Sequence, residues 1–419
     1  MTSATAHIAR EQSRLSAYAL FAALLAAAGL PIYIHAPKFY VDEYGVSLAA
    51  LGAVLFALRL LDVVQDPVLG WLSERLRHVR AQSTGAAVAV MALAMFGLFA
   101  VAPPLSPVIW FAPMLTLVFS AFSFLTINFY AQGVLKAERL RTAGHLRLAR
   151  WRESGALIGV CLAAIAPVAL GQWLDAPFTG FAVGFALVAL LAGVAMRPEW
   201  SGQSVADGIG FREVLRDPMA RRLLLIALVN AAPVAVSSTL FLFFVETTLA
   251  APGKEGVLLL VFFLSAALSA PVWSLLAERF GVKPVLLGTM VGAVLAFGLT
   301  LQLGAGEWIS FALICCVTGA TLGADLTLLP ALFSRRLARI SPSAAQGFGL
   351  WSFVSKLSLA FAAAVLLPSL EAAGFESGAA EMPDGAETLL PLLYAGVPCA
   401  LKLLAIVLVA ATDLDREDV

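Results

Sequence analysis

The chain has 419 residues, of which 61% are hydrophobic and 13% are charged, and its formal net charge is zero. Because soluble domains carry about 25% charged residues, this composition excludes an ordinary soluble protein and indicates a membrane protein. The balanced charge also argues against nucleic acid as a partner. We interpret the four cysteines, which lie in apolar segments without metal-ligand spacing, as small buried hydrophobic residues: Cys161, Cys315, Cys316 and Cys399.

A helix needs about 20 apolar residues to cross a bilayer, and the sequence predicts twelve such spans. They lie at residues 15–36, 46–73, 82–103, 107–135, 149–171, 177–197, 221–248, 256–277, 283–303, 308–333, 346–369 and 388–412. The first run is long and lacks a convincing cleavage site, so we expect it to remain as a membrane helix. We therefore expect an all-α membrane protein.

The longest polar connection divides the spans into two sets of six. We predict an N-terminal bundle at residues 1–197, a cytoplasmic linker at residues 198–220 and a C-terminal bundle at residues 221–419. Much of the segment Pro67–Arg75 recurs at Pro271–Arg279, which indicates a duplication. Duplicated bundles of this kind bind substrate near the midplane, between the halves, and work by alternating access.

Both copies of this segment resemble the cytoplasmic loop motif of the major facilitator superfamily, Gly-x-x-x-Asp/Glu-Arg followed by basic residues. Glu74 and Arg75 belong to the first copy, and Glu278 and Arg279 to the weaker second copy. The resemblance implies a twelve-helix fold of two six-helix pseudo-repeats. It also implies that these four residues latch helix ends in one conformation and release them in the other.

Lys and Arg residues are concentrated in alternate loops, which predicts that both termini are cytoplasmic. In this orientation the acidic loop at residues 371–387 lies outside. We expect a multi-pass protein of a bacterial inner membrane, and we expect a monomer because a duplicated bundle forms its path without a partner.

Three charged residues, Arg59, Asp62 and Asp66, fall inside the second predicted span. Their spacing places them on one helical face, and charges within a membrane commonly mark ion or substrate paths. Carboxylates are hard ligands suited to Na⁺ or a proton, whereas Arg59 compensates only one of the two. The alternative is an internal ion pair. The duplicated segment lacks the two acids, which favours a functional role for them.

The segments Tyr40–Ser47 and Arg59–Gly70 are similar to the glycoside–pentoside–hexuronide:cation symporters, the melibiose carrier group. The shared pattern is Arg-x-x-Asp-x-x-x-Asp-Pro-x-x-Gly. The resemblance implies that Asp62 and Asp66 bind a coupling cation, Na⁺ or H⁺, and that no other cofactor takes part. A further matching segment, Leu350–Leu357, implies that Lys356 is a counter-charge near the cation site; a lysine reaching the membrane interface is the alternative.

Other candidates follow from the same resemblance or are polar and aromatic residues within the predicted spans. The family's sugar-binding acids are replaced by Ala26 and Thr126, which puts a galactoside-type site in doubt, although Ser123 and Thr126 remain candidate cation ligands. Arg150 is a better match than Arg152 to a family arginine, and with Glu153 it implies a gate near the cytoplasmic face, with an ordinary basic helix end as the alternative. The candidate substrate contacts are Tyr33, Asn128, Tyr130, Asp325 and Trp351. His35, Asn230 and Lys402 are weaker cavity candidates, and Asp325 alternatively pairs with Arg335 or Arg336.

These features predict a secondary transporter in which a cation drives symport of a small, polar, sugar-like solute. The alternative is an exporter or a lipid or drug carrier on the same scaffold, which the apolar lining favours. An enzyme is not expected, because the chain lacks His-Glu-x-x-His, Gly-x-Ser-x-Gly and P-loop motifs. A sensor or scaffold would leave the acidic pair and Lys356 without a purpose.

Overall fold

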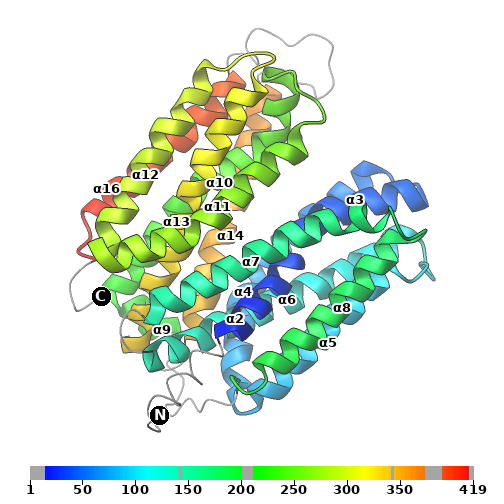
Figure 1. Cartoon of the computed structure of the whole chain (residues 1–419), viewed down its shortest axis with the longest axis horizontal. Helices are drawn as coiled ribbons and strands as arrows, with labels where there is room; N and C mark the ends of the chain where they lie inside the picture. The colour runs from blue at the N-terminus through cyan, green and yellow to red at the C-terminus, as the bar shows by residue number, and fades with distance from the viewer. Residues whose placement is uncertain (1–14, 141–143, 201–210, 341–343, 373–388, 415–419) are drawn as a thin grey trace. The chain divides into compact units, whose positions relative to one another are not determined.

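The computed structural model describes residues 15–140, 144–200, 211–340, 344–372 and 389–414, and their regular structure is helical (Figure 1). The chain divides into two compact units. Unit 1 contains residues Met1–Val214 and Leu337–Phe353, and unit 2 contains Leu215–Arg336 and Val354–Val419. Each unit is described by itself below.

The long helices of unit 1 follow the predicted spans closely. They are α2 (Leu15–Ala27), α3 (Leu30–Tyr44), α4 (Leu48–Arg75), α5 (Arg80–Phe99), α6 (Pro107–Arg139), α7 (Gly144–Leu170) and α8 (Pro177–Met196). A 3₁₀ turn, η1 (Arg77–Val79), leads into α5, and a short helix, α9 (Phe211–Arg216), lies within the predicted linker. The first span, expected to run unbroken over residues 15–36, is instead interrupted before Leu30. Pro31 explains the break, because proline lacks the N–H donor of a helix interior and is tolerated in the first turn, where α3 has it.

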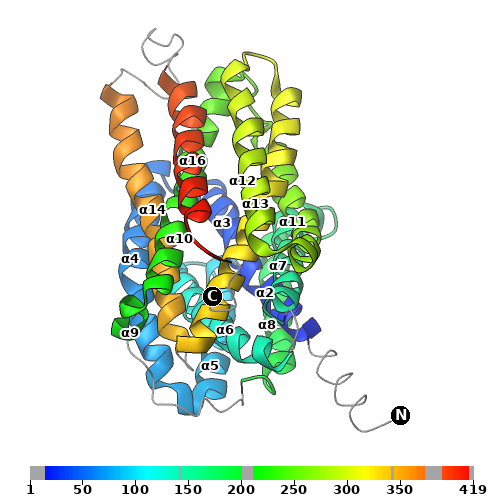
Figure 2. The ribbon, with the colours of Figure 1, turned by 90° about the vertical axis from the view of Figure 1, so that its left-hand side faces the viewer.

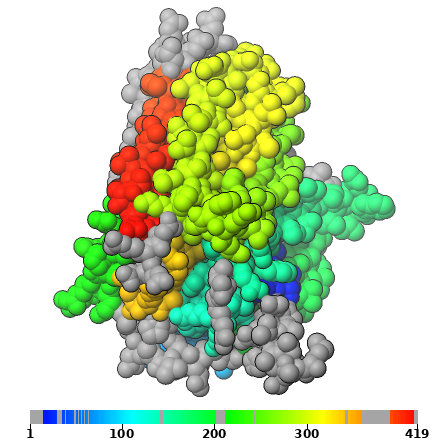
Figure 3. All heavy atoms as spheres, turned by 60° about the vertical axis from the view of Figure 1, so that its left-hand side comes forward, coloured from blue at the N-terminus to red at the C-terminus, as the bar shows by residue number. Residues whose placement is uncertain are grey.

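Unit 2 has a similar set of helices. They are α10 (Pro218–Phe243), α11 (Glu255–Phe280), α12 (Val282–Gly298), most of α13 (Trp308–Ile340), the later part of α14 (Ala345–Ala372), and α16 (Val397–Ala410). Short turns extend three of them: the π-helical turns η2 (Phe244–Thr248) and η4 (Leu392–Gly396), and the 3₁₀ turn η3 (Leu299–Gln302). Within this unit, α16 lies along α10 and α12 (Figure 2). The same helix is visible on the surface of the unit in Figure 3.

Eight of the described helical segments are long and apolar enough to cross a membrane. Many large apolar side chains on them are exposed, such as Leu93, Leu190 and Leu313. A bilayer would cover these side chains, since exposed apolar surface on this scale is not tolerated in water. The chain is therefore an integral, multi-pass membrane protein.

Small residues allow the closest helix crossings in both units. In unit 1, Gly155 and Gly159 of α7 pack directly against the backbone of Ala19 and Ala23 in α2. In unit 2, Gly319 and Gly323 of α13 pack in the same way against α11. Membrane helices gain little hydrophobic energy from contact with each other, so close backbone approach at small residues is a main source of their association.

A charged cap begins unit 2. The carboxylate of Asp217 accepts the Ala220 N–H at 2.7 Å, and Arg336 binds it through two nitrogens at 3.0 and 2.5 Å. Burial by itself raises the pKa of the Asp217 carboxyl, but the hydrogen bonds from Arg336 and Ala220 outweigh it and leave the pKa below its ordinary value. The pair therefore connects the start of α10 to α13 through a charge-assisted contact.

Candidate functional site

The two acids of α4 lie on its buried face. Asp62 is 6% exposed and Asp66 is fully buried, whereas Val64 and Val68 on other faces of the helix are exposed. Helix α4 begins at the Ser47 cap, whose hydroxyl accepts the Ala50 N–H at 3.3 Å, and its length carries both acids deep into the span. The two acids therefore share one face of α4, as their spacing predicts, and that face is buried.

Asp62 is connected to α6 through one intermediate side chain. Gln65 donates from Nε2 to Asp62 Oδ1 at 2.7 Å, and Ser120 of α6 donates to Gln65 Oε1 at 2.9 Å. These contacts hold one carboxylate oxygen of Asp62 in a fixed direction. Neither Gln65 nor Ser120 was among the residues that the sequence singled out.

Asp66 is connected to the first turns of α14. Ser352 donates to Asp66 Oδ2 at 2.5 Å. The contact is possible because Gly70 and Gly349 let the two helices approach: a Cβ added to Gly70 would lie 3.3 Å from Gly349 Cα, and one added to Gly349 would lie 3.1 Å from Asp66 O. Gly70, the glycine of the Asp-Pro-x-x-Gly pattern, therefore allows the close approach of α4 and α14. This approach places the Ser352 hydroxyl beside the acidic pair.

A second cluster in unit 1 surrounds a buried arginine. Arg152 of α7 is 7% exposed, and its Nε donates to Glu153 Oε1 at 2.8 Å. Its guanidinium stacks 3.9 Å from the ring centroid of Tyr130, and Phe348 packs on the same tyrosine at 4.9 Å. Among the described residues, nothing accepts a hydrogen bond from Arg152 Nη2. The cluster therefore presents a buried, positively charged donor.

Thr126 of α6 supplies another buried polar group in unit 1. It lies one helical turn before Tyr130 on α6, so both residues share a face. Its Oγ1 is buried, and no described group forms a hydrogen bond with it. Thr126 Oγ1 and Arg152 Nη2 are thus two buried polar atoms without a hydrogen-bond partner among the described residues. Buried polar atoms normally have such a partner.

The structure places the remaining candidates of unit 1 in different settings. Ser123 is buried on α6. Asn128 is fully buried, accepts from Ser73 at 2.8 Å and donates to Phe124 O at 2.9 Å, so it connects α6 to α4. Trp351 is half-buried. The His35 ring binds the backbone carbonyl of Ala164 in α7 at 2.9 Å. The side chains of Tyr33 and Arg59 lie outside the described residues.

The predicted gating residues also lie in different environments. Arg150, the better match by sequence, is only half-buried, and Arg152 is the arginine that α7 buries. Glu74 is paired with Arg77 at 3.4 Å, and Arg75 stacks on Trp71 at 5.3 Å. In unit 2, Glu278 and Arg279 are exposed, and Arg279 stacks on Phe280 at 5.2 Å. The acidic loop at residues 371–387 falls largely outside the described residues. The latch and gate roles stay predictions.

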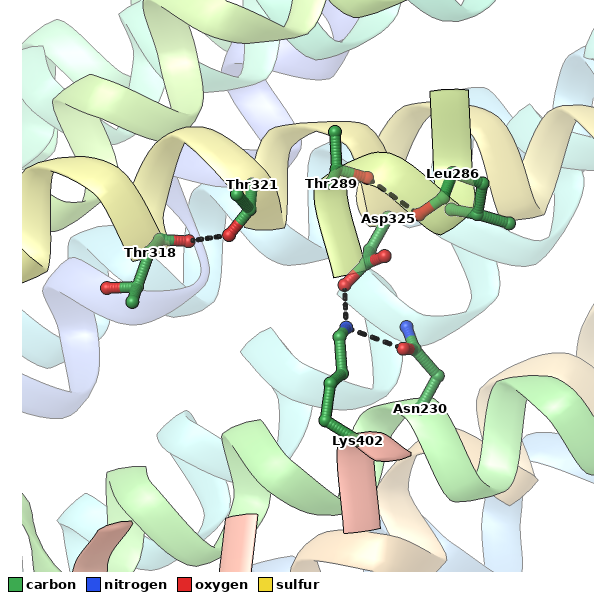
Figure 4. A network of polar contacts seen from close by, with 7 residues as sticks. All are labelled: Asn230, Leu286, Thr289, Thr318, Thr321, Asp325 and Lys402. Carbon is green, nitrogen blue, oxygen red and sulfur yellow. Dashed lines mark hydrogen bonds and ion pairs between the residues drawn. The ribbon is translucent and has the colours of Figure 1, made fainter. Parts of the chain in front are cut away.

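Unit 2 contains the other buried acid. Asp325 of α13 is 6% exposed and pairs with Lys402 of α16, whose Nζ also donates to Asn230 Oδ1 of α10 at 2.6 Å (Figure 4). The alternative pairing of Asp325 with Arg335 or Arg336 is wrong, because Arg336 binds Asp217 and Arg335 donates to Leu414 O at 3.1 Å. Lys356, the predicted counter-charge, is half-buried in the part of α14 that belongs to unit 2.

Comparison with known proteins agrees with this architecture. The mouse sphingosine-1-phosphate transporter MFSD2B is 27% identical over 243 residues, which is 55% of this chain and 49% of that protein. The match thus spans about half the length of this relative.

Solved transporter structures share the fold. A bacterial homologue of the iron transporter ferroportin in an outward-facing state has a TM-score of 0.68 at 14% identity, covering 94% of this chain and 98% of its own. A variant of the E. coli fucose:proton symporter FucP has a TM-score of 0.64 at 12% identity, covering 93% and 98%. The human organic anion transporter MFSD10 has a TM-score of 0.62 at 17% identity, covering 96% of this chain and 99% of its own.

A family model described as MFS/sugar transport protein matches residues 15–416, which is nearly the whole chain. The match agrees with the helical architecture and with the loop motif that predicted the major facilitator superfamily, whereas the melibiose-carrier subgroup stays a prediction. The chain therefore belongs to the MFS/sugar transport protein family and is a membrane transporter of the major facilitator superfamily.

Proposed function

We propose that the protein is a cation-coupled secondary transporter of an amphiphile with an anionic head group. The observation that carries the head-group assignment is the buried guanidinium of Arg152, whose Nη2 has no acceptor among the described residues. Arg152 lies near the start of the predicted span at residues 149–171, and a buried charge in a membrane protein is usually functional. A phosphate or carboxylate would supply the missing acceptor, because the guanidinium fork matches both groups.

The surroundings of Tyr130 favour an anion over a stacked sugar ring. Stacking on a sugar requires an accessible aromatic face, but Arg152 and Phe348 already pack on this ring. The Thr126 hydroxyl, one turn away, is suited to donate a second hydrogen bond to the same anion. The relative's name points the same way, because sphingosine 1-phosphate combines a phosphate with an apolar chain.

The acidic pair of α4 supplies the proposed coupling. Asp62 and Asp66 are both buried, and they accept hydrogen bonds from the neutral donors Gln65 and Ser352, respectively. Carboxylate oxygens are hard ligands, so Na⁺ or a proton is the kind of ligand that this pair would bind. Binding of the cation would then favour the conformation that accepts the ligand, and alternating access would carry both across.

A sugar-like solute is the second candidate. The family model carries the description of sugar transport, and the motif around Asp62 and Asp66 resembles sugar symporters. This candidate and the first differ in what Arg152 does, so one experiment separates them.

The test is ligand-induced thermal stabilisation of the purified full chain in detergent. The probes are sphingosine 1-phosphate, sphingosine, lysophosphatidate, melibiose and glucuronate, each with NaCl or choline chloride and at two pH values. We expect stabilisation by the two phosphate amphiphiles, less by sphingosine, and an increase with Na⁺ or at lower pH. Stabilisation by melibiose alone would contradict the proposed head-group recognition and support the sugar-like candidate.

Arg152→Lys tests the residue directly, because it keeps the charge near Glu153 but removes the planar fork. A charge-assisted hydrogen bond contributes about 1.5–3 kcal/mol, so the apparent affinity for the phosphate amphiphile should fall by about tenfold to a hundredfold. Arg150→Lys is the matched control, two residues away on the same helix and only half-buried. Equal affinity in both variants would overturn the role of Arg152.

A further inference from the structure

Unit 2 contains a buried charged group that the proposed transport mechanism does not use. Asp325, Lys402 and Asn230 come from three helices, α13, α16 and α10, and meet within the membrane-spanning part of the unit (Figure 4). Asp325 is 6% exposed and Lys402 is 7% exposed. A buried ion pair of this kind is seldom retained for stability, because well-packed apolar residues stabilise a core equally well.

One carboxylate oxygen of Asp325 remains unsatisfied. Oδ2 binds Lys402, but no described residue forms a hydrogen bond with Oδ1. Asp325 lines a pocket of about 80 Å³ in unit 2, together with Lys402. A cavity needs at least about 10–15 Å³ to hold one water molecule, so this pocket has room for a few waters or a partly hydrated ion. It is too small for the body of a lipid.

The other polar groups of the pocket are acceptors. Thr318, Thr321 and Ser237 line it, and each donates its hydroxyl hydrogen to a carbonyl on its own helix, at 2.8, 2.8 and 3.3 Å. The hydroxyl oxygens therefore retain lone pairs and have no hydrogen left for an anion. The spacing of three and four between Thr318, Thr321 and Asp325 places all three on one face of α13. Oxygen acceptors around a carboxylate suit a small cation.

We propose that this pocket is a second site for a monovalent cation, Na⁺ or a proton. Asp325 coordinates the cation, and the bound cation displaces the Lys402 ammonium from Asp325. In the absence of the ligand cation, the Lys402 ammonium neutralises Asp325 and is held by Asn230. When a cation binds at Oδ1, the attraction between Asp325 and Lys402 weakens and α16 is released from α13. The titratable side chains that line the pocket are Asp325, Lys402 and Cys399.

The experiment uses the full chain with Asp62→Asn and Asp66→Asn, so that the first candidate site is silent. Thermal unfolding, followed by tryptophan fluorescence, is titrated with NaCl against choline chloride at constant ionic strength, and separately with pH in choline chloride. We expect stabilisation by Na⁺ or by protons to persist in this background, and the arm in which it appears identifies the ion. Its absence in both arms would overturn the proposal.

When Asp325→Asn and Lys402→Met are introduced together into the Asp62→Asn, Asp66→Asn background, the stabilisation by cations should disappear. This double change removes both charges together, so it leaves no buried uncompensated charge that would prevent folding. Lys402→Met alone should lower the cation concentration at the midpoint by about tenfold or more, because the competing internal charge is gone. Cation dependence that is unchanged in the double variant would contradict the assignment of Asp325.

A matched pair of threonines tests the pocket itself. Thr321→Val removes a pocket oxygen and should weaken cation binding by about fivefold, the effect of one hydrogen-bond-sized contact. Thr289 of α12 is also buried and donates to Leu286 O on its own helix at 2.9 Å (Figure 4). It is not among the residues that line the pocket. Thr289→Val should leave cation binding unchanged, and equal effects of the two substitutions would refute a site at this pocket.

Discussion

The crossing of α2 and α7 gives a sharp prediction about the stability of unit 1. Gly155 and Gly159 lie against the α2 backbone, and a Cβ added at Gly155 would be 2.5 Å from the carbonyl carbon of Ala19. At Gly159 it would be 2.5 Å from Ala23 Cα. Real Cβ atoms essentially never come within 3.0 Å of another heavy atom, and backbone atoms cannot rotate away as a side chain can. Gly155→Ala must therefore push the two helices apart.

The size of the effect follows from two opposed terms. Alanine favours a helix over glycine by about 1 kcal/mol, whereas overpacking of a tight interface costs about 1–3 kcal/mol. Gly184 of α8 supplies the control, because a Cβ there would meet nothing within 4 Å. Gly184→Ala should therefore gain only the stability that comes from the higher helix propensity of alanine. We expect Gly155→Ala to be less stable than Gly184→Ala by about 1–3 kcal/mol.

Thermal unfolding of the purified variants in one detergent measures this difference. For a unit of this size, 1 kcal/mol shifts the midpoint by about 2–4 °C, so the two variants should differ by several degrees. Gly159→Ala should behave like Gly155→Ala, and the double variant should show less than the sum because both changes separate the same interface. Equal midpoints for Gly155→Ala and Gly184→Ala would refute the reasoning.

Two further predictions concern charged contacts. Because the pKa of Asp217 is lowered in the folded protein, its ion pair with Arg336 stabilises unit 2 above the unfolded pKa, about 3.9, and this contribution is lost as the pH falls through the folded value. Asp217→Asn keeps a side chain that caps α10 but should remove this part of the acid sensitivity, as measured by unfolding midpoints between about pH 3 and 7; an unaltered acid profile would contradict it. Ser352→Ala removes the donor to Asp66 and should change the Na⁺ or proton concentration for half-maximal stabilisation by about fivefold. Ser358→Ala on the same helix is its control, because Ser358 donates to Leu228 O at 2.8 Å, and matching shifts in the two variants would remove Ser352 from the cation site.

The amino-acid sequence by itself determined the class of the protein. Long apolar runs and a low charged fraction require a bilayer, because no aqueous core could bury so much apolar surface. The recurrence of Pro67–Arg75 at Pro271–Arg279 indicated the duplication. The spacing of Asp62 and Asp66 placed both acids on one face, because helical periodicity is a local property that residue order controls directly. Pro31 carried the signal for the break before α3, although the prediction of one continuous span overlooked it.

Only the tertiary structure decided which side chains meet. The sequence favoured Arg150 over Arg152, but the helix rotation that packs Gly155 against α2 buries Arg152 and leaves Arg150 half-buried. Asp325 finds Lys402, 77 residues away, instead of the nearer arginines. Such pairs depend on how helices cross and rotate against each other. That geometry is set by backbone contacts at small residues spread over the whole bundle, which no local pattern of residues records.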